Sequence, residues 1–434
     1  MSRKTFVLDT NVFLHDPEAA LKFRDSHVVI PLVVLEELDK LKRFTDELGK
    51  NARQVIRFLD GLKGNIFKGI LLSNGSFLSM FIENKNLDRD GFPLSLEPKK
   101  HRILFAAYWL KQKGHEVVIM ISKDFVLRIK AESIGIEARD YASLRESFDN
   151  LYSGYQKITV EKRQVDELMT RGHLTLSQTD LFPNEFCRLT AGEQSTTLGK
   201  YNKKKSRIEL LPSREEDIWG IRPLNDKQQC AMELLLNDDI KLVTLIGQAG
   251  TGKTLMALVA GLRKVFDEAI YNRILVSRPI MPLGKDIGYL PGTKEEKIYH
   301  WMQPIYDNLE FVCESISGID NSVETKQWIM ESEKIEMEAV TFIRGRSLAR
   351  TYTIIDEAQN LTPHEVKTVI SRAGKGTKVI LTGDPTQIDN PYLNKDSNAL
   401  TYVIGKFKPY EIYGQIFFDK TERSELAALA ANIL

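Results

Sequence analysis

The sequence has few cysteines and no long hydrophobic run. Its three cysteines, Cys187, Cys230 and Cys313, lie far apart. An odd number of widely spaced cysteines fits neither a disulfide framework nor a zinc site, and it suits a reducing compartment. No apolar stretch approaches membrane-spanning length, and the run 6–8 near the start is too short for the core of a signal peptide. We therefore expect a cytoplasmic protein with no membrane partner.

The sequence also lacks an excess of either charge. Its 60 lysines and arginines and 59 aspartates and glutamates leave a formal charge of +1 at pH 7. Because the whole chain is not a polycation, any contact with nucleic acid must come from local basic patches. With 434 residues, of which 42% are hydrophobic, the chain is long enough for two or three domains, each with its own core.

The first part of the chain alternates between strand-like and helix-like segments. This alternation predicts an α/β domain over residues 1–148. The predicted strands are 5–8, 27–30 and 116–121, and predicted helices begin near Pro31, Arg102 and Asp124.

Acidic residues stand at the carboxyl ends of these strands, where α/β domains gather their ligands. Asp9 and Asp124 follow two of the strands, and Glu37 lies on the helix after the second strand. If the three carboxylates converge, they can bind Mg²⁺ or Mn²⁺, which prefer oxygen ligands. Acidic residues at strand ends also serve as helix N-caps or solvated loop residues, so the residues alone leave both interpretations open.

Residues 152–212 have a different character. Short strand candidates separated by turn residues predict a small β-rich connecting region. The candidates are 156–160, 185–189, 196–201 and 207–211. The stretch 200–207 places Tyr201 among basic residues. Such a hairpin can hold a single strand of nucleic acid by charge and stacking, or it can be a solvated hairpin tip.

The stretch 247–254 has the pattern of a phosphate-binding loop, G-x-x-x-x-G-K-[ST]. An apolar run precedes it and a helix-compatible segment follows it, which is the context the pattern needs. Glycines allow backbone N–H groups to surround a phosphate, and the helix start adds its positive dipole end. We expect Lys253 to reach the β- and γ-phosphates of a nucleoside triphosphate and Thr254 to bind Mg²⁺. The loop consists of Gly247, Gln248, Ala249, Gly250, Thr251, Gly252, Lys253 and Thr254.

Residues elsewhere in this half complete the expected site. Asp356 and Glu357 end a predicted strand, where one carboxylate can hold Mg²⁺ and the other can orient the attacking water. Gln387 follows the next predicted strand and is expected to contact the γ-phosphate or its water. Upstream of the loop, Gln228 is expected to read the adenine edge.

An arginine is expected to neutralise charge in the transition state. Arg423, at the start of the last predicted helix, is one candidate, and Arg278, Arg344 and Arg346 compete with it. Each of these arginines can instead form a surface ion pair.

Three segments of the first domain, 7–12, 34–38 and 121–124, resemble motifs of the PIN nuclease domain. The resemblance covers most of residues 1–145. It implies that Asp9, Glu37 and Asp124 hold one or two metal ions that activate water for phosphodiester cleavage.

The chain departs from the PIN pattern at one carboxylate. Members of the family carry an aspartate ahead of the helix that here begins near Arg102, but this chain has Lys99, Lys100 and His101 there. A lysine near a metal site weakens cation binding, so a residual nuclease and an inactive domain that holds RNA both remain open. Other acidic residues of the preceding loop do not have the family's spacing; they are Asp88, Asp90 and Glu97.

The second half is similar to superfamily 1 helicase cores and, in its spacing, to PhoH-family ATPases. The residues that carry this similarity are Gln228, 247–254, 278–280, 290–292, 356–359, 383–387 and Arg423. A PIN domain joined to such a core resembles PIN-PhoH fusion proteins across nearly the whole chain. The resemblance implies an ATP-hydrolysing RNA helicase that uses ATP and Mg²⁺ on single-stranded RNA, joined to a PIN domain that cleaves or holds RNA with Mg²⁺ or Mn²⁺.

Residues 222–434 leave room for one RecA-like core, whereas monomeric helicases of this superfamily use two. We therefore expect head-to-tail association, with an arginine from the adjacent subunit completing the site, and the resemblance to ring ATPases favours a hexamer. Two alternatives stay open: an ATP-dependent RNA-binding scaffold with an inactive PIN domain, and a P-loop kinase or phosphate-starvation regulator. The motifs 356–359 and 383–387 argue against the kinase or regulator, because in helicases they couple hydrolysis to strand binding.

Overall fold

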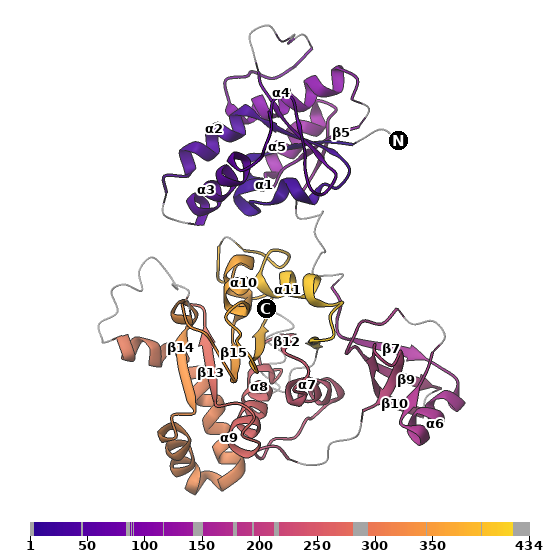
Figure 1. Ribbon diagram of the computed structural model, residues 1–434, viewed down its shortest axis with the longest axis vertical. Coiled ribbons are helices and arrows are strands. Elements are labelled where there is room, and N and C mark those ends of the chain that lie inside the picture. Colours follow the sequence, from indigo (N-terminus) through magenta and orange to yellow (C-terminus); the bar gives the residue numbers. More distant parts are fainter. Residues whose placement is uncertain are drawn as a thin grey trace. The chain divides into compact units, whose positions relative to one another are not determined.

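The computed structural model contains two compact units, Met1–Glu146 and Ser147–Leu434 (Figure 1). Among the described residues, no helix has the length and apolar character needed to cross a membrane. The described residues are 4–44, 47–83, 87, 89, 91–115, 117–141, 151–176, 180–192, 195–211, 217–280, 294–343, 345–391 and 393–419.

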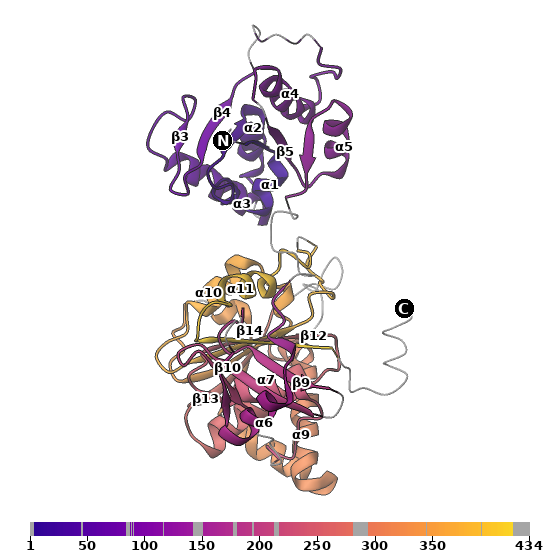
Figure 2. The same cartoon turned by 90° about the vertical axis from the view of Figure 1, so that its right-hand side faces the viewer.

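The first unit is built on a sheet with the strand order β3-β4-β2-β1-β5-β6. All neighbouring strands are parallel except β3, which pairs antiparallel with β4. The strands are β1 (Thr5–Leu8), β2 (His27–Pro31), β3 (Ile70–Leu71), β4 (Phe77–Phe81), β5 (Val118–Ile121) and β6 (Glu137–Arg139). Figure 2 shows β3 and β4 at one edge and α5 beside the opposite edge. The helices are α1 (Thr10–His15), α2 (Leu32–Leu41), α3 (Glu47–Asp60), α4 (Lys99–Gln112) and α5 (Phe125–Ser133), with a short 3-10 helix at Ala19–Lys22.

The register of this sheet brings two loops together. Strands β1 and β5 are fully buried neighbours, and Leu8 at the end of β1 pairs with Ile121 at the end of β5. The next residues, Asp9 and Ser122, therefore leave the sheet at the same edge. Asp9 caps α1 and Asp124 caps α5, so both acids are fixed at helix starts.

The second unit contains the β-rich region as a sheet with the order β7-β9-β10-β11-β8. The expected strands are present, but the region also contains a helix, α6, that we did not predict. Val165 and Leu168 of α6 are buried against the sheet, and Gly172 ends the helix in the left-handed conformation (φ +74°). The elements are β7 (Tyr155–Thr159), α6 (Lys162–Arg171), β8 (His173–Leu174), β9 (Phe186–Ala191), β10 (Ser195–Asn202) and β11 (Arg207–Leu210).

The larger sheet of the second unit is entirely parallel, with the order β14-β13-β15-β16-β12-β17. The predicted α/β class is confirmed in both units. The strands are β12 (Leu242–Gly247), β13 (Arg273–Arg278), β14 (Ile335–Ala339), β15 (Thr351–Ile355), β16 (Lys378–Gly383) and β17 (Tyr413–Phe418). The helices are α7 (Asp226–Leu236), α8 (Lys253–Leu262) with a π-helical end (Arg263–Asp267), α9 (Lys294–Glu331, kinked at Gly318), α10 (Pro363–Ile370) and α11 (Ala399–Phe407). Two 3-10 helices follow strands β14 and β15, at Val340–Ile343 and Ala358–Asn360.

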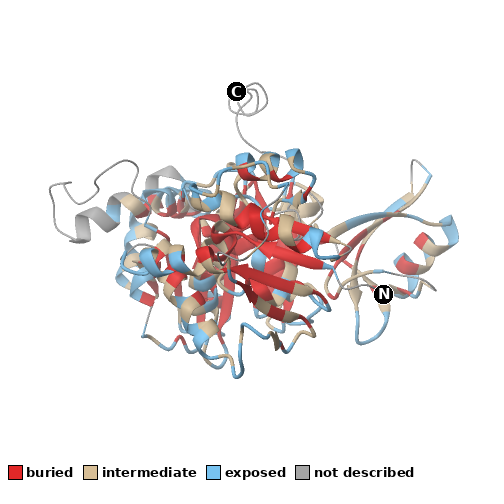
Figure 3. Cartoon of the chain, turned by 90° about the horizontal axis from the view of Figure 1, so that it is seen from above, coloured by how far each residue is buried: buried red, intermediate tan, exposed pale blue. Residues whose placement is uncertain are grey.

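Helices cover both faces of this sheet (Figure 1). Alternating residues of β12 show the two layers: Val243 and Leu245 pack with α7, α8 and α9, while Leu242 and Ile246 pack with α10 and α11. Burial is concentrated on the strands (Figure 3). Strand β16 lies between β12 and β15, so the strand before the phosphate-binding loop and the strand before the acidic pair are not neighbours.

The side chain of a lysine, Lys378, lies inside this core. The Lys378 side chain is fully buried, and its Nζ donates to the carbonyl oxygens of Leu234 and Asn237, each at 2.7 Å. These carbonyls belong to the last turn of α7, where helix carbonyl groups have no helical partner and attract positive charge. Lys378 therefore ties the end of α7 to the start of β16.

We predict that Lys378→Met destabilises the protein by about 2–4 kcal/mol, because two carbonyls inside the protein lose their hydrogen-bond donor. Burial lowers the pKa of Lys378 to about 7, so above that pH the unfolded chain binds more protons than the folded one and stability rises with pH. The cost of the substitution should therefore grow from about pH 6 to about pH 9. Chemical unfolding at the two pH values measures it. Lys375→Met, at an exposed position, is the control and should change little.

Candidate functional site

The phosphate-binding loop connects the buried strand β12 to helix α8, as the sequence predicts. Gly252 precedes the helix in the left-handed conformation (φ +85°), which side chains disfavour. Gly247 is needed for space, because a Cβ atom there would lie 2.7 Å from the carbonyl oxygen of Phe418 on β17. The two glycines thus allow the turn and its close approach to the neighbouring strand.

Lys253 is folded back onto its own loop. Its Nζ donates to the carbonyl oxygens of Gly247 (2.6 Å) and Gln248 (2.8 Å). Gln228 supports the loop, since its Nε2 donates to the Thr251 carbonyl at 3.3 Å and its Oε1 accepts from the Leu224 N–H at 2.7 Å. Gln228 is 3% exposed, and each end of its amide has a partner inside the protein.

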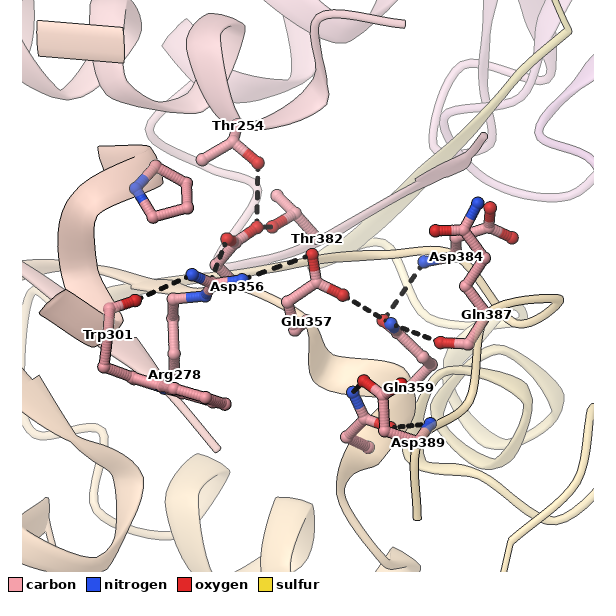
Figure 4. Close-up of polar contacts among 12 residues, drawn as sticks. Thr254, Arg278, Trp301, Asp356, Glu357, Gln359, Thr382, Asp384, Gln387 and Asp389 are labelled. Atoms are coloured by element: carbon pink, nitrogen blue, oxygen red, sulfur yellow. Dashed lines mark hydrogen bonds and ion pairs between the residues drawn. The ribbon is translucent and has the colours of Figure 1, made fainter. Parts of the chain in front are cut away.

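Asp356 lies next to Thr254 although the two residues are 102 positions apart (Figure 4). One of its oxygens, Oδ1, accepts hydrogen bonds from the hydroxyls of Thr254 (2.8 Å) and Thr382 (2.6 Å). The hydroxyl of Thr254 and the carboxylate of Asp356 are oxygen donors of the kind that Mg²⁺ takes in nucleotide sites. These donors fit a divalent cation, with Thr382 from the intervening strand β16 fixing the carboxylate.

Glu357 has the environment of a general base. Its backbone is in the left-handed conformation (φ +54°), directly after Asp356 at the end of β15. Burial and the neighbouring charge of Asp356 raise the pKa of Glu357. A raised pKa makes a carboxylate a better proton acceptor near neutral pH.

Sequence reasoning did not assign a role to Gln359, which the structure places between the two predicted motifs. Its Nε2 donates to Glu357 Oε2 at 2.5 Å and to the Gln387 carbonyl at 2.9 Å, and its Oε1 accepts from the Asp384 N–H at 3.1 Å (Figure 4). Gln387 therefore meets this network through its backbone, and its side chain is exposed. The signal in the sequence that could have indicated a role for Gln359 was its position within the 356–359 motif.

The candidate arginines have different surroundings. Arg278 lies in the same site, with Nε 3.3 Å from Asp356 Oδ2 and Nη2 3.5 Å from Glu357 Oε1. Arg346 instead pairs with two carboxylates of β14, Glu336 at 3.0 Å and Glu338 at 2.7 Å. The other two candidates, Arg344 and Arg423, lie outside the described residues.

The basic hairpin between β10 and β11 has carboxylate partners for most of its charges. Lys205 and Arg207 both contact Glu209, at 3.0 and 2.9 Å. Lys200 pairs with Glu233 of α7 at 2.8 Å. Tyr201 packs against the apolar core of the β-rich region. These contacts favour a structural hairpin over a patch that holds nucleic acid.

The three acids of the first unit do converge. Asp9 is 1% exposed, and it accepts from the Thr10 N–H (2.7 Å) and the Ser122 hydroxyl (2.6 Å). The hydroxyl of Thr10 donates to Glu37. Burial is the main cause that raises the pKa of Asp9 to about 6, and the charge of Glu37 adds to it.

The cation that the structure places beside these acids is a lysine. Lys100, in the first turn of α4, forms an ion pair with Asp124, and its pKa is raised by that contact and by the charges of Asp9 and Glu37. In the part of the chain that the structure describes, no group of three His, Cys, Asp or Glu side chains is arranged to hold a metal ion. The acids thus come together, but their arrangement does not fit a divalent cation. Among the other acids considered, Glu97 is exposed, and Asp88 and Asp90 lie outside the described residues.

We predict that Gly383→Ala disrupts the network around Gln359, since the new Cβ would lie 2.2 Å from Gln359 Oε1. Displacing Gln359 releases Glu357, so we expect ATP turnover to fall about 10- to 100-fold. Gln359→Ala should cause a similar loss. If both changes act through this contact, the double variant should be no slower than the worse single variant, whereas multiplicative losses would contradict the coupling.

Comparisons with known proteins cover both units. The family model described as "PIN domain" matches residues 6–142, and the model described as "PhoH-like protein" matches residues 220–433. "Protein PhoH2" of Bacillus subtilis is 43% identical over 99% of this chain and 100% of its own length. Proteins of the same name from Thermobispora bispora and Mycolicibacterium smegmatis are each 32% identical over 99% of this chain, and over 96% and 97% of their own lengths. The chain therefore belongs to the family of PIN-PhoH fusion proteins, with a PIN domain followed by a PhoH-type P-loop ATPase domain.

Proposed function

We propose that the chain is an ATP-hydrolysing RNA motor of the PhoH type, which acts on single-stranded RNA in the cytoplasm while the PIN domain cleaves or holds the strand. The observation that carries the proposal is the pair of adjacent contacts in which Thr254 donates to Asp356 and Gln359 donates to Glu357, the next residue. It joins the residues that would bind the triphosphate to the loop after β16. A site that only bound a nucleotide would not need this connection.

Binding of ATP begins with the loop opening around its own lysine. Lys253 leaves the carbonyls of Gly247 and Gln248 and moves to the β- and γ-phosphates. The backbone N–H groups of the loop and the start of α8 then surround the phosphates. Mg²⁺ held by Thr254 and Asp356 would neutralise charge that develops on the phosphates.

Hydrolysis uses Glu357. Its carboxylate takes a proton from the water whose oxygen attacks the γ-phosphorus, while the bond to the β-phosphate oxygen breaks and ADP leaves. Arg278 contacts both acids, so it must move for Asp356 to hold a cation and for Glu357 to receive water. Gln359 passes the resulting shift of Glu357 to the backbone at Asp384 and Gln387.

An RNA-binding scaffold with an inactive PIN domain is the second candidate. One observation favours it over a nuclease-coupled motor, namely the position of Lys100 beside Asp124 among the PIN acids. Such a scaffold binds RNA in an ATP-dependent manner but neither cleaves it nor moves along it. Movement of RNA along the chain distinguishes it from the motor.

We predict that Glu357→Gln lowers the turnover number for ATP by about 100-fold or more, while ATP binding is retained. Lys253→Ala should weaken ATP binding itself. Hydrolysis by the unchanged protein should rise with single-stranded RNA, and a tailed RNA duplex should unwind only with ATP. Glu324→Gln, at an exposed position on α9, is the control. Wild-type hydrolysis by Lys253→Ala would overturn the proposal, and stimulation without unwinding would favour the scaffold.

We also propose that the subunits form a closed ring, favoured as a hexamer, in which an arginine enters the site of the next subunit. In a mixture, Lys253→Ala subunits can donate the arginine, and Arg423→Ala subunits can bind ATP. We therefore predict that two inactive variants regain ATPase activity when mixed, with Arg344→Ala tested in parallel. Light scattering measures the assembly. A monomer with full turnover would contradict the ring.

A further inference from the structure

The side chain of Lys100 lies at the edge of the acidic centre of the first unit, where it is 54% exposed and pairs with Asp124. Lys100 lies in the first turn of α4, within the stretch 99–101 in which the resemblance to PIN domains leads us to expect a carboxylate and the sequence has none. Its Nζ forms an ion pair with Asp124 Oδ2, and its charge also acts on Asp9 and Glu37. The lysine therefore pairs directly with Asp124 and acts on Asp9 and Glu37 only through its charge.

Hydrogen bonds inside the protein occupy many of the oxygens that a divalent cation would need. Both oxygens of Asp9 accept, one from the Thr10 N–H and one from Ser122 Oγ. Glu37 Oε2 accepts from Thr10 Oγ1. On Asp124, Oδ1 accepts from the Leu127 N–H at 3.2 Å, and Oδ2 contacts Lys100. Mg²⁺ demands near-octahedral oxygen ligation, which this arrangement does not offer.

Further positive side chains lie around the centre. The neighbouring ammonium group of Lys99 lowers the pKa of Lys40, which is also affected by Glu36 and Glu37. Glu36 has a further cationic neighbour, since its Oε2 lies 3.8 Å from Arg102 Nη1. A divalent cation entering here would meet positive side chains instead of an uncompensated cluster of acids, which weakens its attraction.

We propose that the ammonium group of Lys100 takes the place of the divalent cation, so that the PIN centre of this chain is neutralised by a lysine and needs no metal. The three carboxylates then serve as partners for Lys100 and for the caps of α1 and α5. The centre then lacks the metal ion that would activate water for phosphodiester cleavage, so the PIN unit does not cut RNA, and its holding of RNA rests on the proposed function. The inference concerns the first unit and is independent of ATP hydrolysis in the second.

The substitution Lys100→Asp tests whether the lysine takes the place of the cation. This change removes the internal cation and supplies a further carboxylate, so it should create a divalent-metal site that the unchanged protein lacks. Lys99→Asp is the matched control, because it adds the same charge at the neighbouring position without removing the partner of Asp124. Lys100→Asn removes the positive charge without adding a carboxylate. Its affinity for a divalent cation should lie between those of the unchanged protein and Lys100→Asp.

The test titrates Mn²⁺ into the full-length, metal-stripped chain without nucleotide, and reads bound Mn²⁺ by electron paramagnetic resonance. Each variant is compared with the same variant carrying Asp9→Asn in addition. The difference between the two excludes metal bound elsewhere in the chain, including at Asp356. We expect one Asp9-dependent Mn²⁺ per chain in Lys100→Asp, with an affinity at least about 100-fold above that of the unchanged protein. Lys99→Asp should show no such site.

Thermal unfolding gives a second readout that does not depend on catalysis. Without divalent cations, Lys100→Asp should unfold at a lower temperature than the unchanged chain, because four carboxylates repel one another. Addition of Mn²⁺ should raise the unfolding temperature of this variant again. The unchanged chain should not respond to Mn²⁺ through Asp9. A tight Asp9-dependent Mn²⁺ site in the unchanged chain would overturn the proposal, as would a folded Lys100→Asp variant that gains no site. If Lys100→Asp does not fold, the same comparison of Asp9-dependent Mn²⁺ binding is made with Lys100→Asn and the unchanged chain.

Discussion

The candidate nucleotide site of the second unit depends on the hydrogen bonds that Asp356 accepts from Thr254 and Thr382. Three strands contribute to this contact, since Thr254 follows β12, Thr382 lies near the end of β16 and Asp356 follows β15. The contact forms only because β16 lies between the other two strands and all three run in the same direction. The parallel sheet thus brings three separate segments to one edge, where a triphosphate and its cation can be bound.

The two units arrange acidic residues in different ways. In the second unit, Asp356 accepts from Thr254 at the phosphate-binding loop, and Arg278 contacts Asp356 and Glu357 at 3.3 and 3.5 Å. In the first unit, Lys100 and the hydroxyls of Thr10 and Ser122 already engage the acids. The acids of the second unit adjoin a loop where a nucleotide would supply phosphate oxygens to the same cation, whereas the acids of the first unit adjoin Lys100.

The β-rich region supports the nucleotide domain. Asn184 donates to the Tyr413 carbonyl of β17 at 2.8 Å, and Arg188 forms an ion pair with Asp226 at the start of α7. Gly154 lies so close to β17 that a Cβ would be 1.9 Å from the Gln415 carbonyl oxygen. Because α7 carries Gln228 beneath the phosphate-binding loop, contacts made by this region stabilise the element that supports the loop.

The amino-acid sequence by itself determined the features that are local in the chain. The phosphate-binding loop is contiguous, and the strands before Asp9 and Asp356 are short apolar runs, so spacing and periodicity were enough to predict them. Helix α6 was missed because its apolar residues, such as Val165 and Leu168, are few and lie among charged ones. Only the tertiary structure decided which distant side chains meet: Gln359 with the Gln387 carbonyl, and Lys100 with Asp124. These contacts join residues 28 and 24 positions apart through strand order and helix placement, and neither of these follows from local sequence.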